Sequence, residues 1–497
     1  LNGIVDCGAK GVPRGCLTNK LVNPAPRFGF AWDPKGDGKT AIRGGYGIFF
    51  EHMNGNEANA EALQAGTSPS VLNGSVANVT GYENIGANAQ GPGAPVAPTS
   101  TFAIPDHGKW PYVQQWNLGV QHEFPGRVLL SVSYVGSKGS ELSFRRDLNQ
   151  LQPVPAANNP YPAGVPITAQ DCNAANWTTN AQGLPTAIPI STGAIATGQA
   201  AINLGIACND NAAAYYRPFQ GYGDITYISN GANSIYHALQ VGVQRTVGDL
   251  TLSFSYTYSH SIDDASDSDD TLSVNGYDPA GNRASSNFDL RHNATISYVY
   301  NLPFFKNSQG FKRTLLGGWQ ASGITVAQSG LPFNVVNGSE FSDNAGVAKS
   351  GAFTASRLDL VGDPYQIPAA QQAQAGFGVL ALNPAAFELP TGLTFGNVQR
   401  NEFRLPGRLN FDFGLFKRFA FKERYAFEFR WETFNVFNHT QLDALGGTVS
   451  AGGTGLTTTD GCNVQNAGDP SCAGGGFLVL DGAHNPRIMQ FGLRFQF

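Results

Sequence analysis

The acidic stretch SIDDASDSDD, residues 261–270, is the densest group of possible metal ligands in the chain. Calcium is bound by several carboxylate oxygens, and a single loop can supply most of them. The stretch lacks the glycine of the EF-hand pattern D-x-[DN]-x-[DN]-G, so its spacing does not match that loop. We therefore favour a solvated acidic loop over a calcium site. The five candidate ligands are Asp263, Asp264, Asp267, Asp269 and Asp270.

Side chains that could carry out catalysis are not grouped in any known pattern. The eight histidines show neither an H-x-x-x-H nor an H-E-x-x-H spacing, and the chain contains no G-x-S-x-G or P-loop segment. The glycines of RGGYG, residues 43–47, lie within a predicted strand and indicate a bend or close packing. The sequence predicts a protein that is not an enzyme and has no cofactor.

Aromatic and charged side chains could instead contact a solute. Four aromatic residues of one long loop, Tyr215, Tyr216, Phe219 and Tyr222, are candidates for ligand contact. Charged residues also alternate with aromatic ones in two segments near the C-terminus. They could line a solute path, but we favour a ladder of cross-strand ion pairs on a polar wall. This second set is Asp412, Arg418, Glu428, Arg430 and Glu432.

Segments of alternating apolar and polar residues must position these groups. The last of them, QFGLRFQF at residues 490–497, carries large apolar residues on one side and mainly polar ones on the other. Period two indicates a strand between two environments, and about ten residues suffice for a tilted strand to cross a bilayer. The pattern predicts about eleven strands, near 27–33, 40–50, 112–123, 127–136, 235–246, 250–260, 289–301, 317–328, 409–419, 424–435 and 487–497.

The connections between the predicted strands alternate between short and long. The long ones lie at about 51–111, 137–234, 261–288, 329–408 and 436–486. Tight periplasmic turns alternating with extended external loops are typical of an outer-membrane barrel. The sequence thus predicts an all-β, transmembrane, antiparallel β-barrel with long extracellular loops, located in the bacterial outer membrane. The acidic loop would then face outward and could repel anionic lipopolysaccharide.

The parity of the strands predicts a larger barrel than this chain. Bacterial single-chain barrels have even strand numbers, and an open sheet edge in lipid leaves backbone groups without partners. Eleven strands would close with a parallel seam, so we expect further strands before Leu1. One missed strand, for instance in YGDITYIS near residue 225, would undo this inference.

Composition and cysteine spacing agree with an exported membrane protein. A net charge of −5 gives no electrostatic footprint for nucleic acid, and no run of 18 apolar residues indicates a transmembrane helix. Six cysteines form three close pairs, all on the loop side of the predicted topology. We predict disulfides that form in an oxidising compartment, with free buried thiols as the alternative. The pairs are Cys7 with Cys16, Cys172 with Cys208, and Cys462 with Cys472.

Five stretches in this order resemble the C-terminal half of a TonB-dependent outer-membrane receptor, most closely the Oar-like group, whose members carry a carboxypeptidase-regulatory-like domain. They are NPAPRFGFAWDPKGDGKTAIRGGYGIFFE (23–51), PYVQQWNLGVQHEF (111–124), NFDLRHNATISYVYNLPF (287–304), FGNVQRNEFRLPGRLNFDFGLFKRF (395–419) and FRWETFNVFNHTQ (429–441). The C-terminal residues Gln490, Gly492, Phe495 and Phe497 are similar to the signal that the barrel-assembly machinery reads.

The resemblance implies a 22-stranded barrel filled by an N-terminal plug, with uptake of a large solute driven by TonB. Residues 1–497 would be the C-terminal portion of that barrel domain, and the plug, the TonB box and the first half of the barrel are not among them. The implied partners are outer-membrane lipid and lipopolysaccharide, the barrel-assembly machinery, TonB acting through the plug region, and an unidentified solute. The charged polar wall could also dock the plug.

Two other functions compete with the receptor. A passive porin-like channel would share the strand pattern but have no plug. A surface-exposed binding or adhesion β-protein would place its large aromatics in a core, and a propeller would show a blade repeat of about 40–50 residues, which the sequence lacks.

Overall fold

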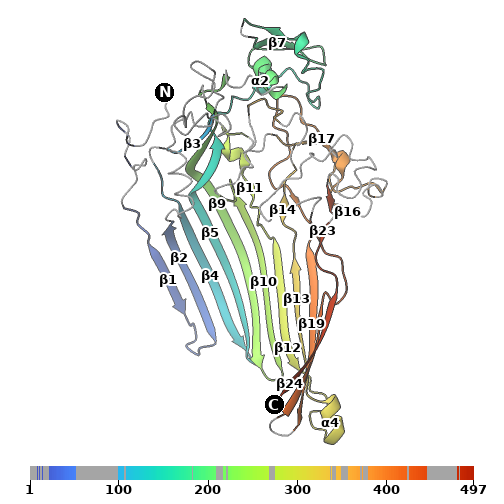
Figure 1. Ribbon diagram of the computed structural model, residues 1–497. Helices are drawn as coiled ribbons and strands as arrows, with labels where there is room; N and C mark the ends of the chain where they lie inside the picture. Colours follow the sequence, from blue (N-terminus) through green and yellow to red (C-terminus); the bar gives the residue numbers. More distant parts are fainter. Residues whose placement is uncertain are drawn as a thin grey trace, which may run out of the picture.

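The computed structural model describes residues 22–51, 99–105, 108–181, 183–208, 216–219, 222–267, 275–335, 343–348, 356–369, 379–421, 425–444, 478–480 and 482–497, with a few single residues between them. Eleven long strands lie side by side in chain order in one sheet, and each pairs antiparallel with the next (Figure 1). They are β1 (Arg27–Trp32), β2 (Thr40–Phe50), β4 (Tyr112–Phe124), β5 (Val128–Asp147), β9 (Tyr222–Val247), β10 (Leu250–Asp263), β12 (His292–Asn301), β13 (Trp319–Gln328), β19 (Arg408–Phe421), β20 (Tyr425–Phe434) and β24 (Ile488–Gln496).

The eleven predicted strands are confirmed, with one correction to a loop. The region 137–234, predicted as a long loop, contributes the outer parts of β5 and β9, which have 20 and 26 residues. A tilted strand needs about ten residues to cross the bilayer, so β5 is about twice that length and β9 more than twice. The segment YGDITYIS is therefore strand, but it continues β9, so the count along the sheet stays at eleven.

Strand pairing sorts the side chains onto two faces, as the alternation predicts. Across β10, β12, β13 and β19, one register row on the polar face is Ser253, Ser297, Ile324 and Asp412. The opposite face is rich in aromatic and aliphatic side chains that are largely exposed: Phe28 is 69% exposed, and Phe491 is 71%. Large apolar side chains that are exposed to this extent are expected where lipid supplies the contact. We call this the lipid-facing face.

The two ends of the sheet differ in what connects the strands. Short connections, at 33–39, 125–127 and 248–249, lie at one end, which is the periplasmic end of an outer-membrane barrel. In the first of these turns the Asp33 carboxylate accepts hydrogen bonds from the backbone N–H groups of Lys35, Gly36 and Gly38. The same end carries helix α4 (Gly310–Leu316). No helix of the described residues is long and apolar enough to cross a membrane.

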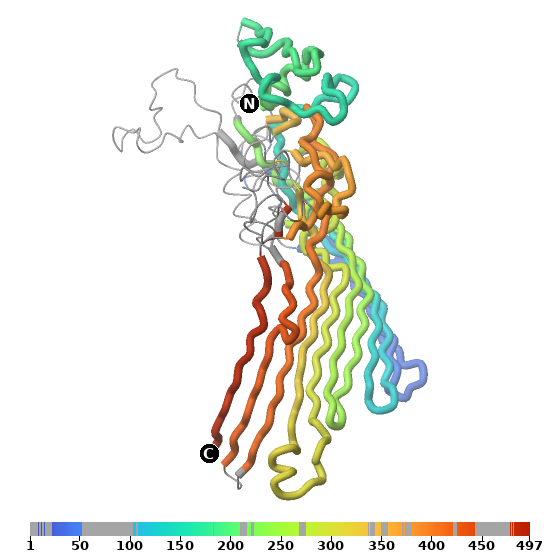
Figure 2. Tube along the Cα trace, turned by 90° about the vertical axis from the view of Figure 1, so that its right-hand side faces the viewer, coloured from blue at the N-terminus to red at the C-terminus, as the bar shows by residue number. Residues whose placement is uncertain are grey.

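At the other end, the long connections fold into a cap (Figures 1 and 2). Small strands and short helices make up the cap, and β3 and β11 flank the main sheet beside β9 and β10. The elements at this end are β3 (Thr99–Ala103), η3 (Ala156–Asn158), η4 (Ala174–Asn176), β6 (Thr178–Thr179), β7 (Pro185–Pro189), β8 (Ile195–Thr197), α2 (Gln199–Cys208), η6 (Pro279–Asn282), β11 (Ala284–Ser285), β14 (Pro332–Phe333), β15 (Asp359–Leu360), β16 (Val379–Leu380), η7 (Pro384–Ala386), β17 (Phe387–Glu388), β18 (Phe403–Arg404), β21 (Leu442–Ala444), β22 (Val479–Leu480) and β23 (Gly482–Ala483).

Among the described residues, the buried apolar side chains lie mostly in this cap rather than in the sheet. One cluster surrounds Phe333, Phe387 and Phe403, and a second packs α2 against β7 and β8. A third joins Leu151 and Ile206 to residues 345–348 of another loop. The described parts of the long connections are thus folded structure with hydrophobic cores, which their composition rich in Ala, Gly, Asn, Pro and Ser did not predict.

Candidate ligand-binding surface

The cap is fastened to the strand ends by a buried ion pair. Arg400, which is 1% exposed, donates to the carbonyl and the carboxylate of Asp263 at the outer end of β10. It also donates to the Asn282 carbonyl at 3.0 Å and to Ser266 Oγ at 3.3 Å. Asp263 accepts a further bond from Ser266 Oγ at 2.8 Å. A buried charge needs such a complete set of partners, and this set holds the loop before β19 against β10.

A second charged cluster lies beside the first. The Asp289 carboxylate accepts from Arg291 Nε at 3.0 Å, from Arg404 and from the backbone N–H of Ser261 at 2.7 Å. His260 Nδ1 lies 3.1 Å from the same carboxylate. Burial raises the pKa of Asp289, but the bonds from Ser261, Arg404 and Arg291 outweigh it and hold the pKa below its ordinary value.

These contacts show what two of the aspartates of the acidic loop bind. Asp263 is held by Arg400, and Asp264 pairs with Arg283 at 3.2 Å. Within the described part of the chain, no three His, Cys, Asp or Glu side chains are grouped to hold a metal ion. Asp269 and Asp270 lie outside the described residues. The outer end of β10 therefore uses two of the candidate calcium ligands as anchors for arginine.

The sequence pointed to Asp263, but as a calcium ligand, and gave no sign of the arginine clamp formed by Arg400 and Arg404 with Asp263 and Asp289. Arg400 and Asp263 are 137 positions apart, and Arg404 and Asp289 are 115 apart. No local spacing can mark a pair at that separation. The sequence held only a weak indication of these pairs. The predicted loop before residue 409 contains arginines, and the predicted strand ends near residues 263 and 289 carry aspartates.

Separate loops of the cap also bind one another. Asn203 Nδ2 donates to the Ala345 carbonyl at 3.1 Å, and Arg217 donates to the Ala348 carbonyl at 2.7 Å. Gly346 has a φ of +60°, and a Cβ there would lie 1.8 Å from the Asn203 carbonyl oxygen. Only glycine fits both this backbone conformation and this close approach. The loops after β5 and β13 therefore form one unit.

A buried carboxyl group lies at the base of this unit. Asp147 is 3% exposed, and its Oδ1 accepts from the backbone N–H groups of Asn149 at 2.9 Å and Ile225 at 3.2 Å. Its Oδ2 is buried and has no hydrogen-bond partner among the described residues. Burial and the nearby Asp224, which pairs with Arg217 at 2.8 Å, raise the pKa of Asp147 to about 6.

The described members of the predicted aromatic ligand set lie at the cap end of the sheet. Tyr216 packs against the cluster of Leu151 and Ile206, so it has a structural role there. The backbone of Phe219 is fixed by Asn149, whose side chain accepts from its N–H at 2.7 Å. Tyr222 begins β9, and Tyr215 lies outside the described residues.

The predicted charged wall lies on the polar face of β19 and β20. Arg418 is opposite Glu428, which in turn is opposite Arg494 of β24. Arg430 donates to Glu428 at 2.5 Å, which makes an ion pair along β20. The charges are thus aligned across the strands, but the ion pair found here runs along β20, so the cross-strand ladder stays a prediction.

A hollow of about 320 Å³ includes two residues of this wall, Asp412 and Glu432, in its lining. The hydroxyl groups of Ser253, Ser297 and Ser322 contribute to its lining, together with two acidic side chains. Asp412 accepts from the N–H of Asn435 at 2.9 Å and from Asn410 Nδ2 at 2.8 Å, and Glu432 accepts from Gln490 Nε2 at 2.6 Å. The face offers hydroxyls and carboxylates to a solute or to a domain placed against it.

The C-terminal strand continues both faces. Gln490 and Gly492 lie on the polar face, opposite Glu432 and Arg430. Phe495 stacks against Tyr425, with ring centroids 6.0 Å apart, and Phe497 is 92% exposed. The polar and aromatic positions of the predicted assembly signal therefore lie on opposite faces.

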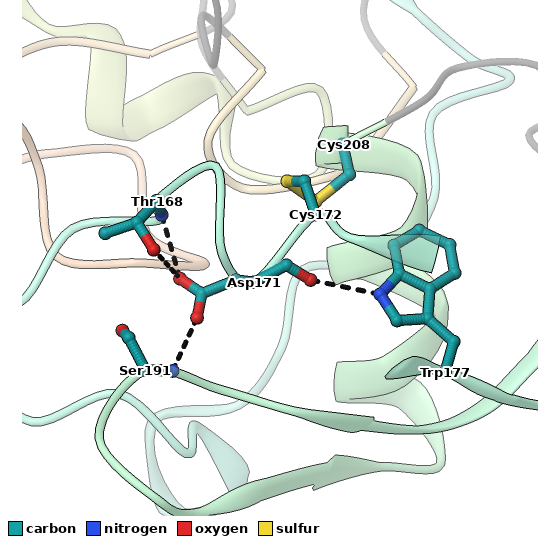
Figure 3. The surroundings of a disulfide bond; sticks show 6 residues. All are labelled: Thr168, Asp171, Cys172, Trp177, Ser191 and Cys208. Atoms are coloured by element: carbon teal, nitrogen blue, oxygen red, sulfur yellow. Dashed lines mark hydrogen bonds between the residues drawn. A yellow bond between two sulfur atoms is a disulfide. The ribbon is translucent and has the colours of Figure 1, made fainter. Parts of the chain in front are cut away.

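One predicted disulfide lies within the described residues. Cys172 and Cys208 are bonded, and their Cα atoms are 5.2 Å apart (Figure 3). Beside it, the Asp171 carboxylate accepts from the N–H groups of Thr168 at 2.8 Å and Ser191 at 2.5 Å. The bridge ties α2 to the loop before β6. The other two predicted pairs, Cys7 with Cys16 and Cys462 with Cys472, lie outside the described residues.

Comparison with known proteins places the chain in a family. It is similar to the outer membrane transporter YddB of Escherichia coli (10% identity, TM-score 0.39), with 95% of this chain and 40% of that chain covered. For the siderophore receptor PirA of Acinetobacter baumannii, the identity is 10%, the TM-score 0.37 and the coverage 95% and 40%. For the ferripyoverdine receptor of Pseudomonas aeruginosa, the identity is 10% and the TM-score 0.37, with 96% of this chain and 34% of that chain covered.

The chain thus spans two fifths or less of the length of these solved structures. No curated protein matches it. A family model described as an outer membrane beta barrel domain matches residues 1–466, which is most of the chain. With its eleven antiparallel strands and lipid-facing aromatic face, the chain belongs to the outer membrane beta barrel domain family and is a protein of the outer membrane.

Proposed function

We propose that this chain is the barrel portion of a TonB-dependent receptor of the Oar-like group, which takes up a large solute across the outer membrane. The observation that carries the proposal is the cap. Its loops have their own hydrophobic cores and are clamped to the strand ends by Arg400 and Arg404. A folded external surface suits the selective capture of a solute better than unhindered diffusion.

The strand number supports the same proposal. Barrels of 16–18 strands leave an aqueous channel, whereas 22-stranded transporters have a plugged lumen. Eleven strands are half of 22. In the proposal, residues 1–497 are the C-terminal portion of the barrel domain, and the plug and its TonB contact belong to other sequence of the receptor.

The polar face has the chemistry to hold a plug. Its charges include Arg418, Glu428 and Arg430, and its hollow presents Asp412 and Glu432. Polar groups of both signs can pair with a neighbouring polar domain while the opposite face stays in lipid. We also propose that the barrel-assembly machinery reads Gln490, Gly492, Phe495 and Phe497 at the C-terminus.

The test uses the protein purified from native outer membranes, with the soluble C-terminal domain of the host's TonB as bait and planar bilayers in KCl as the second readout. A receptor should be captured by TonB and should give no steady stepwise conductance. Stepwise conductance without TonB capture would replace the proposal with a passive channel. Absence of both would favour a surface binding or adhesion protein. A heat-modifiable band on gels confirms that the barrel is folded.

A further inference from the structure

The connection between β12 and β13, residues 302–318, differs from the other short connections. It contains helix α4 and presents five large apolar side chains to the exterior. Phe311 is 77% exposed and Phe304 is 62% exposed. The full set is Phe304, Phe305, Phe311, Leu315 and Leu316. No protein segment of the described residues covers them, although a turn in water would favour polar residues.

Helix α4 is attached to the lipid-facing face of the sheet by hydrogen bonds at its C-terminal end. Lys417 donates to the carbonyls of Leu315 and Gly317 at the C-terminal end of the helix, and Trp319 Nε1 donates to the Leu315 carbonyl at 3.1 Å. Trp319 and Lys417 are register partners, and Phe429 is the partner of Lys417 on the next strand. These positions belong to the lipid-facing face.

The attachment is firm. Lys417 is 3% exposed, and its Nζ lies 5.2 Å from the Trp319 ring centroid and 4.9 Å from that of Phe419. A cation at a helix C-terminus also interacts favourably with the helix dipole. Two carbonyls at the end of α4 accept from the Lys417 Nζ, and two aromatic rings lie beside the charge. The helix is therefore held beside the lipid-facing wall, not below the polar face.

The charges of the connection are all of one sign. Residues 302–318 contain Lys306, Lys312 and Arg313 and no acidic residue. Lys306 pairs with Asp249 of the neighbouring turn at 3.1 Å, while Lys312 and Arg313 lie on the exposed helix. Apolar side chains next to cations are the composition of a segment that lies at a membrane surface with anionic headgroups.

We propose that α4 is a membrane anchor that inserts Phe311 and Leu315 into the periplasmic leaflet of the outer membrane and binds anionic phospholipid headgroups through Lys312 and Arg313. Phe311 and Leu315 are four residues apart and share one side of the helix. The helix that carries them is attached to lipid-facing positions of β13 and β19 through Trp319 and Lys417. This inference needs only the outer-membrane location, so it stands whether or not the protein transports a solute.

The test places the photo-crosslinker p-benzoylphenylalanine at Phe311 in the protein as assembled in cells. The matched control places it at Lys35, an exposed position in the β1–β2 turn at the same end, where Asp33–Lys39 has no large apolar residue. After illumination of outer membranes, mass spectrometry identifies the adducts. Phospholipid adducts at position 311, at least about tenfold above those at position 35, are expected from insertion at the acyl boundary.

The second arm tests the headgroup. In K312Q/R313Q, the share of anionic phospholipid among the adducts at position 311 should fall by roughly fivefold per cation removed. Adducts to a periplasmic protein at position 311, or no lipid adduct there, would overturn the proposal. So would equal labelling at positions 311 and 35. An unchanged anionic share in K312Q/R313Q would overturn the headgroup assignment. A heat-modifiable band verifies folding of every variant, and Leu315 serves as a second crosslinking position.

Discussion

Replacing Arg400 with methionine should release the cap from the sheet while the sheet itself stays folded. Methionine keeps much of the apolar stem but removes the guanidinium that bonds to Asn282, Ser266 and Asp263. Among the described residues the Asp263 carboxylate would keep its bond from Ser266 Oγ, and Asp263 is 2% exposed, so its charge would be left buried and nearly unpaired.

The magnitude follows from that loss. Removing one partner of a buried ion pair costs about 3–5 kcal/mol, because the other charge remains uncompensated. At 1.36 kcal/mol per factor of ten, 3 kcal/mol raises the population of the open cap by roughly 100-fold. The double variant D263N/R400M removes the orphaned charge and should recover a large part of this loss.

Limited proteolysis of the barrel in outer membranes measures the opening. Thermolysin cuts before large apolar residues such as Phe403 and Leu405, and Phe403 is buried in the closed cap. When reclosing is fast, the cleavage rate follows the open population. The matched control is R283M, which breaks the pair with Asp264. Arg283 is 44% exposed, so this pair contributes about 1 kcal/mol or less.

Cleavage of R400M near residue 403 at the rate of R283M would refute the reasoning. Equal rates for R400M and the double variant would show that the buried Asp263 charge is not the source of the cost. Loss of the heat-modifiable band in R400M would show that the clamp supports the sheet as well as the cap.

Three further predictions concern other parts of the chain. Reduction of the Cys172–Cys208 bond, whose cysteines are 36 positions apart, should destabilise the α2 part of the cap by roughly 4 kcal/mol and speed its hydrogen exchange; unchanged exchange would contradict this. The pKa of Asp147 is raised to about 6, so its neutral form favours the folded cap. Asp147 should therefore stabilise the cap by about 3 kcal/mol below pH 4, and this stabilisation should be lost as the pH rises to about 6. Exchange of the cap at pH 5 and pH 7 checks it, and D147N should flatten the dependence. F497D should lower the amount of folded, heat-modifiable protein if the terminal strand is the assembly signal, and normal amounts would argue against that role.

Local chemistry explains why the strands could be predicted so fully. A strand between lipid and a polar lumen must alternate, and its backbone groups must pair within the sheet. The opposite faces of Phe491 and Gln490 can therefore be predicted from their neighbours in the sequence alone. The Cys172–Cys208 pair was predictable for a similar reason, since the two cysteines are close in sequence.

The sequence did not predict which side chains of the polar face lie opposite one another on neighbouring strands. Alternation predicted that Arg430 and Glu428 share the polar face, but only the strand register shows that Arg418 and Arg494 lie on either side of Glu428. The hollow that Asp412 and Glu432 share with serines of three other strands likewise depends on how those strands are aligned.

The sequence by itself determined the eleven strands, their two faces and the membrane in which they lie, because the two solvents on either side of a strand impose a pattern on consecutive residues. Only the tertiary structure decided the cap. Its contacts join Arg400 to Asp263 and Asn203 to Ala345, residues more than 130 positions apart. Such pairs leave no periodic trace, because the loops that carry them meet only after the strands have brought their ends together.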